Sequence, residues 1–506
     1  MAPLFIGMYY QSGSDAAQNS DEYLSMDQAR NIALTYLEGG QVQSIELLQD
    51  EQSLRYSVLV GREAYLYGLY VDARIGEVSF FTPVIGSFES FPSIHIKTIG
   101  EDEPFVERTL WIDSEFILAG FDAVTSDVSL PGRIRGRGNS TWNMLPDKRP
   151  LRLRFETSQN FFHGELAITD WILLADHGDR SLLRNYSALY LARRLDGLTW
   201  TPAARSVHLY VNDEYMGVYL LTEERSLAFE HLDFISDPNP AVSDYFFEME
   251  WRLALEGEEW VDFIRVNSHP NGVVGDASAA AGFDRDYLYE ILYPQDEALT
   301  TEHLEYVQAF LTEVGVLIRQ SAFEAVRERV DLDSLIDFYL VQELYKNMDV
   351  GFASVFLQIR GQGDERRLYH GPVWDFDIAA GNAYWMGVES QTPFGGLYVA
   401  ERHYWYWYLM QMPEFVALLR ERWNTVVHGE VLGMIGHLEH HAATHQSEFE
   451  RNFGRHPILG SDMWPSPEHV NDILTFDGQV TYLTDFLAAR ASYLDDIFNG
   501  RRPMWE

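Results

Sequence analysis

The chain has 506 residues, 46% of them hydrophobic, so it can bury a large core and is long enough for about three domains at roughly 150 residues each. Its 77 acidic against 37 basic side chains give a formal net charge of −40, a field that disfavours nucleic acid and anionic lipid as partners. The absence of cysteine excludes disulfides, thiol catalysis and cysteine-ligated metal centres. No run approaches about 18 apolar residues, so we expect no membrane span.

Residues 1–22 are predicted to form a flexible N-terminus, because their second half is a run of small and polar residues. The segment lacks the basic start and the long apolar run of a signal peptide. Two interpretations therefore stay open: a cytosolic protein, or one whose leader has been removed.

Residues 23–84 are predicted to form a small unit of one helix and antiparallel strands. Ser25 and Gln28 have the spacing of a capping box, and apolar residues then recur at helical spacing as far as Gly39. Alternating runs follow, around residues 44–48, 54–61, 65–71 and 76–81. The ending VDARIGEVSFF resembles that of PepSY domains, which implies a small peptide-binding or inhibitory module rather than an active site.

The remainder, residues 88–500, is predicted to be one α+β domain with two lobes, β-rich first and α-rich later. The β-rich lobe covers about 88–240, including a hairpin turned by Asn212 and Asp213, and the α-rich lobe covers about 300–500. Helices are predicted over residues 181–195, 303–329 and 332–346.

A basic, glycine-containing segment lies in the β-rich lobe. Residues 133–155 hold six arginines and one lysine, Lys148, which we expect to enter an alternating strand. Glycines at 132, 136 and 138 would let backbone N–H groups approach an oxyanion, and neighbouring hydroxyls would add donors. The segment therefore indicates a phosphate site, although a basic hairpin that pairs with acidic neighbours would have the same pattern.

A set of three carboxylates follows the helix predicted over 332–346. Asp349 comes just after it, and Asp375 and Asp377 are two apart in the string PVWDFD. Side chains at i and i+2 of an extended segment point the same way and can share a hard cation, while a third carboxylate could accept a proton from a nucleophile. The alternative is a chance grouping in a chain with 77 acidic residues.

Together these features resemble the CotH family of atypical protein kinases, which is known from bacterial spore coats. The strings that carry the resemblance occur in family order over roughly residues 90–500: RGRGNSTW, DKRPLRLRF, LLADHGDRSLLRNYSALYLA, VHLYVNDEYMGVYLLTEE, LYKNMDVG and GPVWDFD. The resemblance implies a two-lobed kinase-like fold and phosphorylation of Ser or Thr in a protein substrate. It also implies ATP with Mg (or Mn or Ca) and a location outside the cell or on the cell or spore surface, with a cytoplasmic location still open.

Carried over residue by residue, the resemblance implies that Asp349 is the catalytic aspartate and Asp375, aided by Asp377, the metal ligand. Lys148 would hold the nucleotide phosphates and Glu223 would be its ion-pair partner. The nucleotide-binding residues would be Arg135, Arg137, Gly138, Asn139, Ser140, Thr141 and Lys148, and the family's D..LLRN positions match Asp179, Arg184 and Asn185.

One position departs from the family pattern. The family usually has an asparagine five residues after the catalytic aspartate, where this chain has Ser354, a weaker metal ligand. The departure leaves two alternatives to an active kinase: a pseudokinase serving as a coat scaffold, adhesin or binding protein, or a kinase fold that performs another transfer, such as that of AMP.

Three histidines, His437, His441 and His445, are spaced by four residues on a predicted helix. This spacing could hold zinc, but we interpret it as a solvated helix face.

Overall fold

The computed structural model describes residues 23–36, 41–49, 54–62, 65–75, 78–81, 91–100, 108–121, 129–138, 140–162, 166–250, 263–266, 287–351, 353–383, 394–401 and 403–505. The chain forms two compact units, residues 1–90 and 91–506, which are described in turn.

The N-terminal unit consists of one helix and a four-stranded antiparallel sheet in the order β1-β2-β3-β4. The predicted capping box is formed: Ser25 N donates to Gln28 Oε1 over 2.7 Å, and Gln28 N donates to Ser25 Oγ over 3.3 Å. Ala29 and Ala33 of the helix are buried in a core that contains only residues of this unit. The elements are α1 (Met26–Tyr36), β1 (Gln41–Gln49), β2 (Leu54–Arg62), β3 (Tyr65–Asp72) and β4 (Val78–Phe81).

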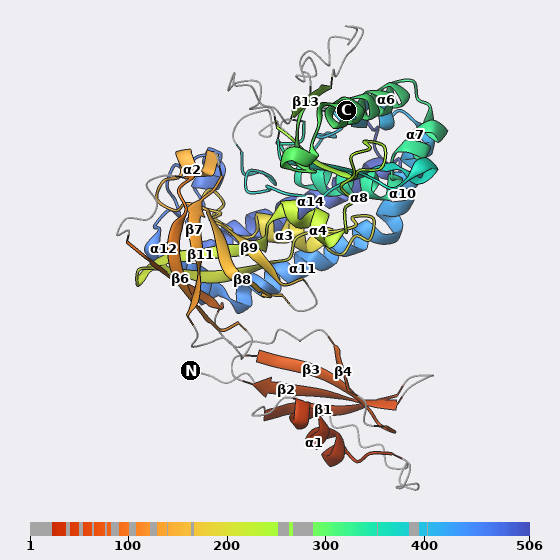
Figure 1. The fold of residues 1–506 in the computed structure, drawn as a ribbon. Coiled ribbons are helices and arrows are strands. Elements are labelled where there is room, and N and C mark those ends of the chain that lie inside the picture. The colour runs from red at the N-terminus through yellow and green to blue at the C-terminus, as the bar shows by residue number, and fades with distance from the viewer. Residues whose placement is uncertain are drawn as a thin grey trace. The chain divides into compact units, whose positions relative to one another are not determined.

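The larger unit begins with a closed barrel in the strand order β10-β11-β9-β8-β7-β6-β5 (Figure 1). Alternate residues of β6 point into the barrel, as a period of two requires, and β5 closes it by pairing in parallel with β10. The predicted turn joins β10 to β11, with Asn212 at φ 50° and Asp213 at φ 66°. The strands are β5 (Ser93–Thr98), β6 (Ile112–Ala119), β7 (Leu130–Gly136), β8 (Leu151–Gln159), β9 (Ile168–Leu174), β10 (Ala204–Val211) and β11 (Glu214–Glu223).

A second sheet follows the barrel in the order β13-β14-β12-β15-β16. Its strands are β12 (Tyr245–Met249), β13 (Phe263–Val266), β14 (Tyr287–Tyr293), β15 (Val355–Arg360) and β16 (Arg367–His370). The sequence analysis missed β12 to β14. These three strands lie between residues 245 and 293, in the stretch between the two predicted lobes.

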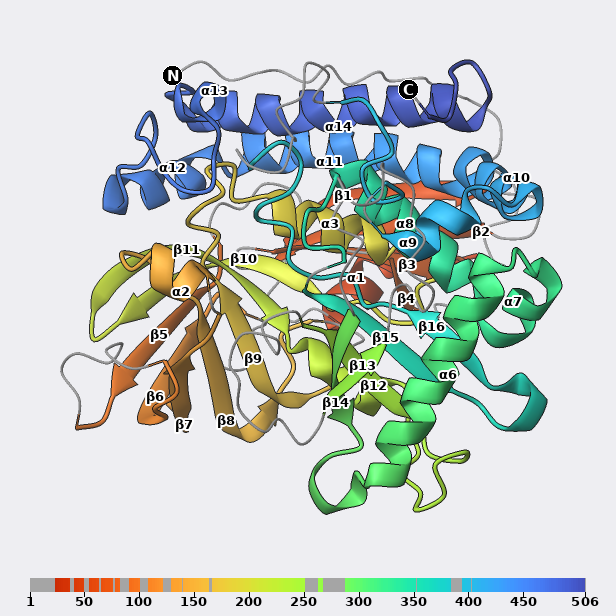
Figure 2. The same cartoon turned by 90° about the horizontal axis from the view of Figure 1, so that it is seen from above.

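Helices cover the rest of the unit, and α11 and α14 run side by side past the barrel and the second sheet (Figure 2). Helix α8 is buried on nearly all sides rather than along one stripe, and the helix predicted over 303–329 is two helices, interrupted where Ser321 takes φ 52°. The α-helices are α2 (Ser140–Met144), α3 (Arg184–Ala192), α4 (Ala228–His231), α6 (Thr301–Arg319), α7 (Phe323–Arg329), α8 (Leu332–Tyr345), α9 (Tyr404–Leu409), α10 (Pro413–Arg422), α11 (His428–Thr444), α12 (Gln446–Arg455), α13 (Glu468–Asn471) and α14 (Phe476–Phe498). Shorter turns are η1 (Arg225–Leu227), η3 (Asp296–Ala298), η4 (Gly363–Glu365) and the π-helical η5 (Trp423–Val427).

The α+β class, β-rich first and mainly helical toward the C-terminus, is confirmed. Within the described residues, no helix combines the length and apolar character needed to cross a membrane.

Candidate active site

A cleft of about 750 Å³ lies in the larger unit, where the barrel meets the segments that follow α8 and β16. One wall carries arginines from the barrel, Arg135, Arg137 and Arg152. Another carries the carboxylates of Asp349, Asp375 and Asp377. The structure therefore brings the predicted basic segment and the three predicted carboxylates to one cavity.

The loop after α8 positions two of these carboxylates. Asn347 Oδ1 accepts a hydrogen bond from Asp349 N over 3.1 Å, and Asn347 Nδ2 donates to the carbonyl oxygen of Asp375 over 3.2 Å. Ser354 Oγ donates to Asp375 Oδ2 over 3.1 Å. Asn347, which the sequence analysis did not single out, therefore links the predicted catalytic and metal-binding aspartates.

The expected extended geometry at Asp375 and Asp377 is wrong. Asp375 has φ 66°, so it lies in the left-handed region, and the argument from two residues along one face of a strand does not apply. Both side chains still line the cleft.

Asp377 has the features of a cation ligand. Its residue is only 6% exposed, and burial raises the pKa of its carboxyl well above the usual value, with further increases from the carboxylates of Asp375, Asp176 and Asp349. A bound divalent cation would relieve this repulsion, so the chemistry of the donor set fits Mg²⁺. Among the residues that the structure describes, however, no three acidic or histidine side chains converge as a metal site.

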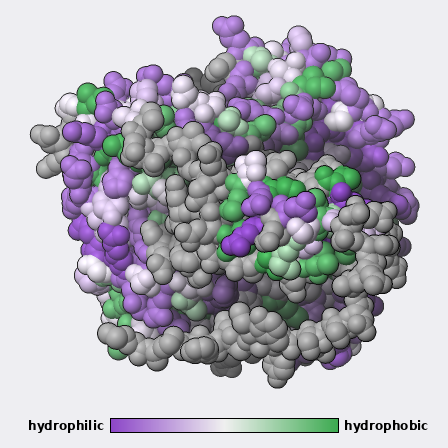
Figure 3. All heavy atoms as spheres, turned by 90° about the horizontal axis from the view of Figure 1, so that it is seen from below, coloured by the Kyte–Doolittle hydropathy of each residue, from purple (hydrophilic) through white to green (hydrophobic). Residues whose placement is uncertain are grey.

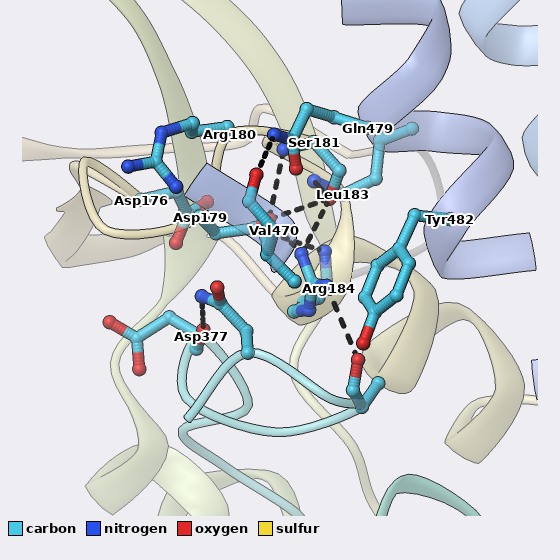
Figure 4. Close-up of polar contacts among 12 residues, drawn as sticks. Asp176, Asp179, Arg180, Ser181, Leu183, Arg184, Asp377, Val470, Gln479 and Tyr482 are labelled. Atoms are coloured by element: carbon cyan, nitrogen blue, oxygen red, sulfur yellow. Dashed lines mark hydrogen bonds and ion pairs between the residues drawn. The ribbon is translucent and has the colours of Figure 1, made fainter. Parts of the chain in front are cut away.

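The loop between β9 and α3 lies against these carboxylates, as Figure 4 shows for Asp176, Asp179, Arg184 and Asp377. Asp179 is fully buried and accepts hydrogen bonds from Arg184 N over 2.9 Å, from Ser181 N over 3.0 Å and from the Arg184 guanidinium. Arg184 Nε in turn donates to Ala379 O over 3.0 Å. The D..LLRN residues thus fasten this loop to the segment that follows Asp377.

Asn185 makes a second connection between the same segments. Its Nδ2 donates to Asp176 Oδ1 over 2.7 Å, and its Oδ1 accepts from Phe376 N over 2.6 Å, between the two cleft aspartates. Asp176 lines the cleft, was missed by the sequence analysis, and has φ 47°. An aspartate in a loop carries no local signal of such a role.

Lys148 is placed differently from the prediction. It lies in a turn ahead of β8 rather than in the strand, does not line the cleft, and is 1% exposed. Its Nζ donates to Val218 O over 2.5 Å. Burial lowers the pKa of Lys148 to about 7, although Asp176 and Asp179 act in the opposite direction. Lys148 therefore faces the loop carboxylates that support the cleft.

The expected ion pair of Lys148 with Glu223 is not formed. Glu223 Oε2 accepts from Ala203 N over 2.7 Å, and Glu223 Oε1 lies 3.1 Å from His231 Nε2. The next residue, Glu224, lines the cleft instead. Strand β11 ends at Glu223, and adjacent side chains near a strand end point in opposite directions, so Glu224 lines the cleft and Glu223 does not.

Glu224 belongs to a network of charges inside the cleft. Its carboxylate pairs with Arg152 over 3.1 Å and with Arg225 over 2.8 Å, and Arg225 also pairs with Glu248 over 3.1 Å. Burial opposes ionisation of Glu224, but Arg225 and Arg152 outweigh it and lower its pKa. These ion pairs hold Arg152 of the arginine wall and the neighbouring Arg225 in place.

The glycine-containing segment forms the rim of the cleft. Arg135, Arg137, Gly138, Ser140 and Thr141 all line it, whereas Asn139 lies outside the described residues. Arg108 Nη1 donates to Gly138 O over 2.9 Å, and the Arg137 guanidinium lies 5.7 Å from the centre of the Trp374 ring. The rim thus contacts the segment that carries Asp375.

Two of the glycines are required by packing. A Cβ at Gly136 would lie 2.2 Å from the Trp142 ring, and one at Gly132 would lie 2.4 Å from Arg154 O. Gly138 has φ 81° and is the one of the three that needs glycine's backbone freedom.

An α+β protein whose cleft sets arginines opposite carboxylates is suited to an anionic ligand that binds together with a divalent cation. The family comparison agrees with this class: residues 134–494 match the family described as CotH kinase protein, which is more than half of the chain. The chain belongs to this family, and the family implies a kinase that uses ATP. No curated protein matches the sequence. The comparison gives no support for a PepSY domain in residues 23–84.

Proposed function

We propose that this protein is an ATP- and Mg-dependent protein Ser/Thr kinase whose active site is the cleft. The observation that carries the proposal is that the arginines at 135, 137 and 152 and the carboxylates at 349, 375 and 377 line one cavity in a member of a kinase family. Arginine provides planar donors for phosphate oxygens, and carboxylates are hard ligands for Mg²⁺.

In the proposed reaction, Asp349 accepts the proton of the substrate hydroxyl as that oxygen attacks the terminal phosphorus of ATP; the bond from this phosphorus to the β–γ bridging oxygen breaks, and ADP leaves. Arg135, Arg137 and Arg152 hold the phosphates. Asp375 and Asp377 would hold Mg²⁺, which supplies charge neutralisation to the phosphates when bound. Mg²⁺ is commonly bound by one or two carboxylates together with substrate phosphates, so two carboxylates of the protein would be enough.

Two parts of the proposal rest on the sequence resemblance, and a third, the role of Lys148, rests on the position of this residue in the structure. Substrates outside the cell or on a surface follow from the family's spore-coat members. Residues 23–84 would act as a separate PepSY-like peptide-binding module, and their helix with four antiparallel strands supports that architecture. Lys148 would act indirectly, by neutralising Asp176 and Asp179 next to the cleft.

The test is incubation with ATP and Mg²⁺ followed by intact-mass analysis. A kinase that phosphorylates itself gains the mass of phosphoryl groups, whereas a protein that transfers AMP to itself gains the mass of AMP. Thermal unfolding with ATP and Mg²⁺ reports binding separately, because a ligand at about 100 times its dissociation constant stabilises by about 2.7 kcal/mol. Absence of both stabilisation and mass gain contradicts the proposal.

A pseudokinase is the second candidate, and Ser354 is the observation that favours it. The Ser354 hydroxyl donates to Asp375 and occupies a lone pair of that carboxylate. Stabilisation by ATP and Mg²⁺ without any mass gain, on the protein or on added protein substrates, would identify this alternative.

A further inference from the structure

Five arginines form a stripe on the outer face of the barrel. Arg133, Arg135 and Arg137 alternate along and just beyond β7, and Arg152 and Arg154 alternate along β8. The residues between them, among them Ile134 and Leu153, are buried in the barrel. The register places Arg133 opposite Arg154 and Arg135 opposite Arg152. We call these five residues the arginine stripe.

The stripe runs out of the cleft. Arg135, Arg137 and Arg152 line the cavity, whereas Arg133 and Arg154 lie outside its lining. Arg133 is exposed, and the Arg154 side chain is 39% exposed. Because a strand rises about 3.3 Å per residue, the outer end is about 13 Å from the inner end. The two outer arginines are therefore accessible and are not required for a ligand inside the cleft.

Like charges directly opposite on neighbouring strands are unfavourable, so this arrangement needs support. Trp111 provides part of it: the guanidinium carbons of Arg133, Arg135 and Arg154 lie 5.6, 5.0 and 4.8 Å from the centre of its ring. Asp170 on β9 pairs with Arg152 over 2.9 Å and with Arg154 over 2.8 Å. The surroundings fix the direction of the guanidinium groups.

The carboxylates that pair with the arginine stripe do not neutralise all of its positive charge. Asp170 and Glu224 are the carboxylates that pair with the stripe among the described residues, and Glu224 is shared with Arg225. No described carboxylate forms an ion pair with Arg133 or Arg135, although the exposed Asp113 of β6 lies directly opposite Arg133. The stripe therefore keeps a net positive charge in a chain whose formal charge is −40, where an acidic partner is repelled by most other surfaces.

We propose that Arg133 and Arg154 bind acidic residues that flank the Ser or Thr to be phosphorylated, so that the protein selects acidic segments of its substrates. The inference rests on the proposed kinase function and adds the class of substrate. Carboxylates complement these guanidinium groups, because Arg133 has no ion pair among the described residues and Arg154 shares Asp170 with Arg152. An extended peptide that follows the stripe from the cleft would place its acidic side chains on the outer arginines.

The test uses two labelled synthetic peptides that each contain one serine. In one peptide glutamates flank the serine, and in the other lysines flank it. Binding is measured by fluorescence anisotropy without nucleotide. We expect the glutamate peptide to bind the wild type more tightly, with an affinity that falls as salt is raised. Arg133→Gln together with Arg154→Gln should weaken it by about fivefold, the size expected for two exposed ion pairs, and leave ATP affinity unchanged.

Two further variants control for charge and folding. Arg30→Gln with Arg327→Gln removes the same charge from exposed positions elsewhere and should leave peptide affinity unchanged. Arg133→Lys with Arg154→Lys keeps the charge and should retain most of the binding. Equal binding of the glutamate peptide to the wild type and to the Arg133→Gln, Arg154→Gln variant overturns the inference, as does tighter binding of the lysine peptide.

Phosphate transfer to the same peptides separates this inference from the proposed function. Stripe-dependent binding without any transfer supports the docking surface and contradicts the kinase proposal. Equal transfer to both peptides, unaffected by Arg133→Gln and Arg154→Gln, supports the kinase and overturns the docking surface.

Discussion

Beside the cleft, one lysine is buried with two aspartates. Lys148 is 1% exposed, Asp179 is fully buried and Asp176 is 5% exposed. Burial raises the pKa of Asp176, and the neighbouring Asp179 raises it further, while the hydrogen bond from Asn185 and the charge of Lys148 act against this increase. Both aspartates lie in the loop that is tied to the cleft.

Replacing Lys148 should therefore change the stability of the protein more than its affinity for ATP. We expect Lys148→Met to lower the free energy of unfolding by about 3 kcal/mol, since it removes the cation near the buried carboxylate of Asp176, while Asp179 keeps its ion pair with Arg184. The exposed Lys97→Met is the matched control. The measurement is denaturant unfolding together with ATP affinity at a temperature where the variant is folded. Unchanged stability with lost ATP binding would instead place the Lys148 amine on the phosphates.

Ser354 supports Asp375 by a hydrogen bond, which gives a second prediction. Ser354→Ala removes the donor and should raise the Mg²⁺ concentration needed for half-maximal ATP binding by about tenfold, the effect typical of groups that orient a metal ligand. Ser354→Asn should need no more Mg²⁺ than the wild type, because asparagine tolerates φ 56° and offers both a donor and a carbonyl oxygen.

The measurement is ATP affinity by calorimetry across a series of Mg²⁺ concentrations, with affinity in the absence of metal as the reference. If Ser354→Ala leaves the metal dependence unchanged, the hydroxyl does not position a metal ligand and the metal lies elsewhere.

The sequence predicted the residue types of the site better than their directions. The carboxylates at 349, 375 and 377 and the arginines at 135 and 137 all line the cleft. Lys148 and Glu223 do not, because the direction of a side chain depends on where a strand begins or ends. Contacts over many residues, such as that of Asn185 with Phe376, leave no local pattern to recognise.

At the scale of elements, the histidines of α11 form a packed face rather than the expected solvated one. His441 stacks on Tyr186 of α3, with ring centres 4.9 Å apart, and Tyr186 Oη shares a hydrogen bond of 2.8 Å with His437 Nε2. Burial lowers the pKa of His441 to about 3 and that of His437 to about 4, with repulsion from neighbouring cationic groups adding to both decreases. The folded protein therefore holds these rings neutral.

Stability should consequently depend on pH below about 6.5. Unfolded histidine titrates near 6.5, so between that pH and about 3 the unfolded state binds more protons at His441 than the folded state does. The stabilisation is present above pH ~6.5 and is lost as pH falls, at up to about 1.4 kcal/mol per pH unit for this histidine. Denaturant unfolding from pH 7 to 5 measures it.

The variant His441→Phe should flatten this dependence, because phenylalanine can pack beside Phe91 and Phe449 without a proton to gain. The exposed His440 of the same helix provides the control His440→Gln, which should leave the slope as in the wild type. An identical slope in wild type and His441→Phe would show that His441 does not drive the acid sensitivity.

Local elements could be predicted from the sequence where one short signal defines them, as at the Ser25 capping box and the Asn212–Asp213 turn. The barrel closure and the second sheet could not. The parallel pairing of β5 with β10 joins segments more than a hundred residues apart, and the second sheet inserts β12 between β14 and β15. Such pairings depend on the register of distant strands rather than on composition.

At the scale of the whole molecule, a strongly acidic chain surrounds a locally basic site. Hydrophilic side chains occupy much of the coloured surface on the face drawn in Figure 3, as a charge of −40 predicts. Such a field favours solubility and repels anionic polymers, whereas the arginines at the cleft create a local exception. Selectivity for an anionic ligand would then come from this one region.

The two compact units should be separable. The buried clusters of residues 91–506 contain no residue of the N-terminal unit, and the converse also holds. We expect a chain beginning at Phe88 to fold, to unfold cooperatively on heating, and to bind ATP with the affinity of the full chain. Calorimetry of both chains checks this prediction. An insoluble product would show that the first unit is needed for the larger unit to fold.

The central claim is that Asp349 acts on the substrate hydroxyl in a cleft that binds ATP. The most direct measurement is transfer of the terminal phosphate from labelled ATP to the protein or to an added peptide in a single turnover, for the wild type and for Asp349→Asn. We predict transfer by the wild type, a rate at least about 100-fold lower in Asp349→Asn, and the same ATP affinity in both. Transfer by Asp349→Asn at the wild-type rate, or none by the wild type with ATP and Mg²⁺ bound, would contradict the account.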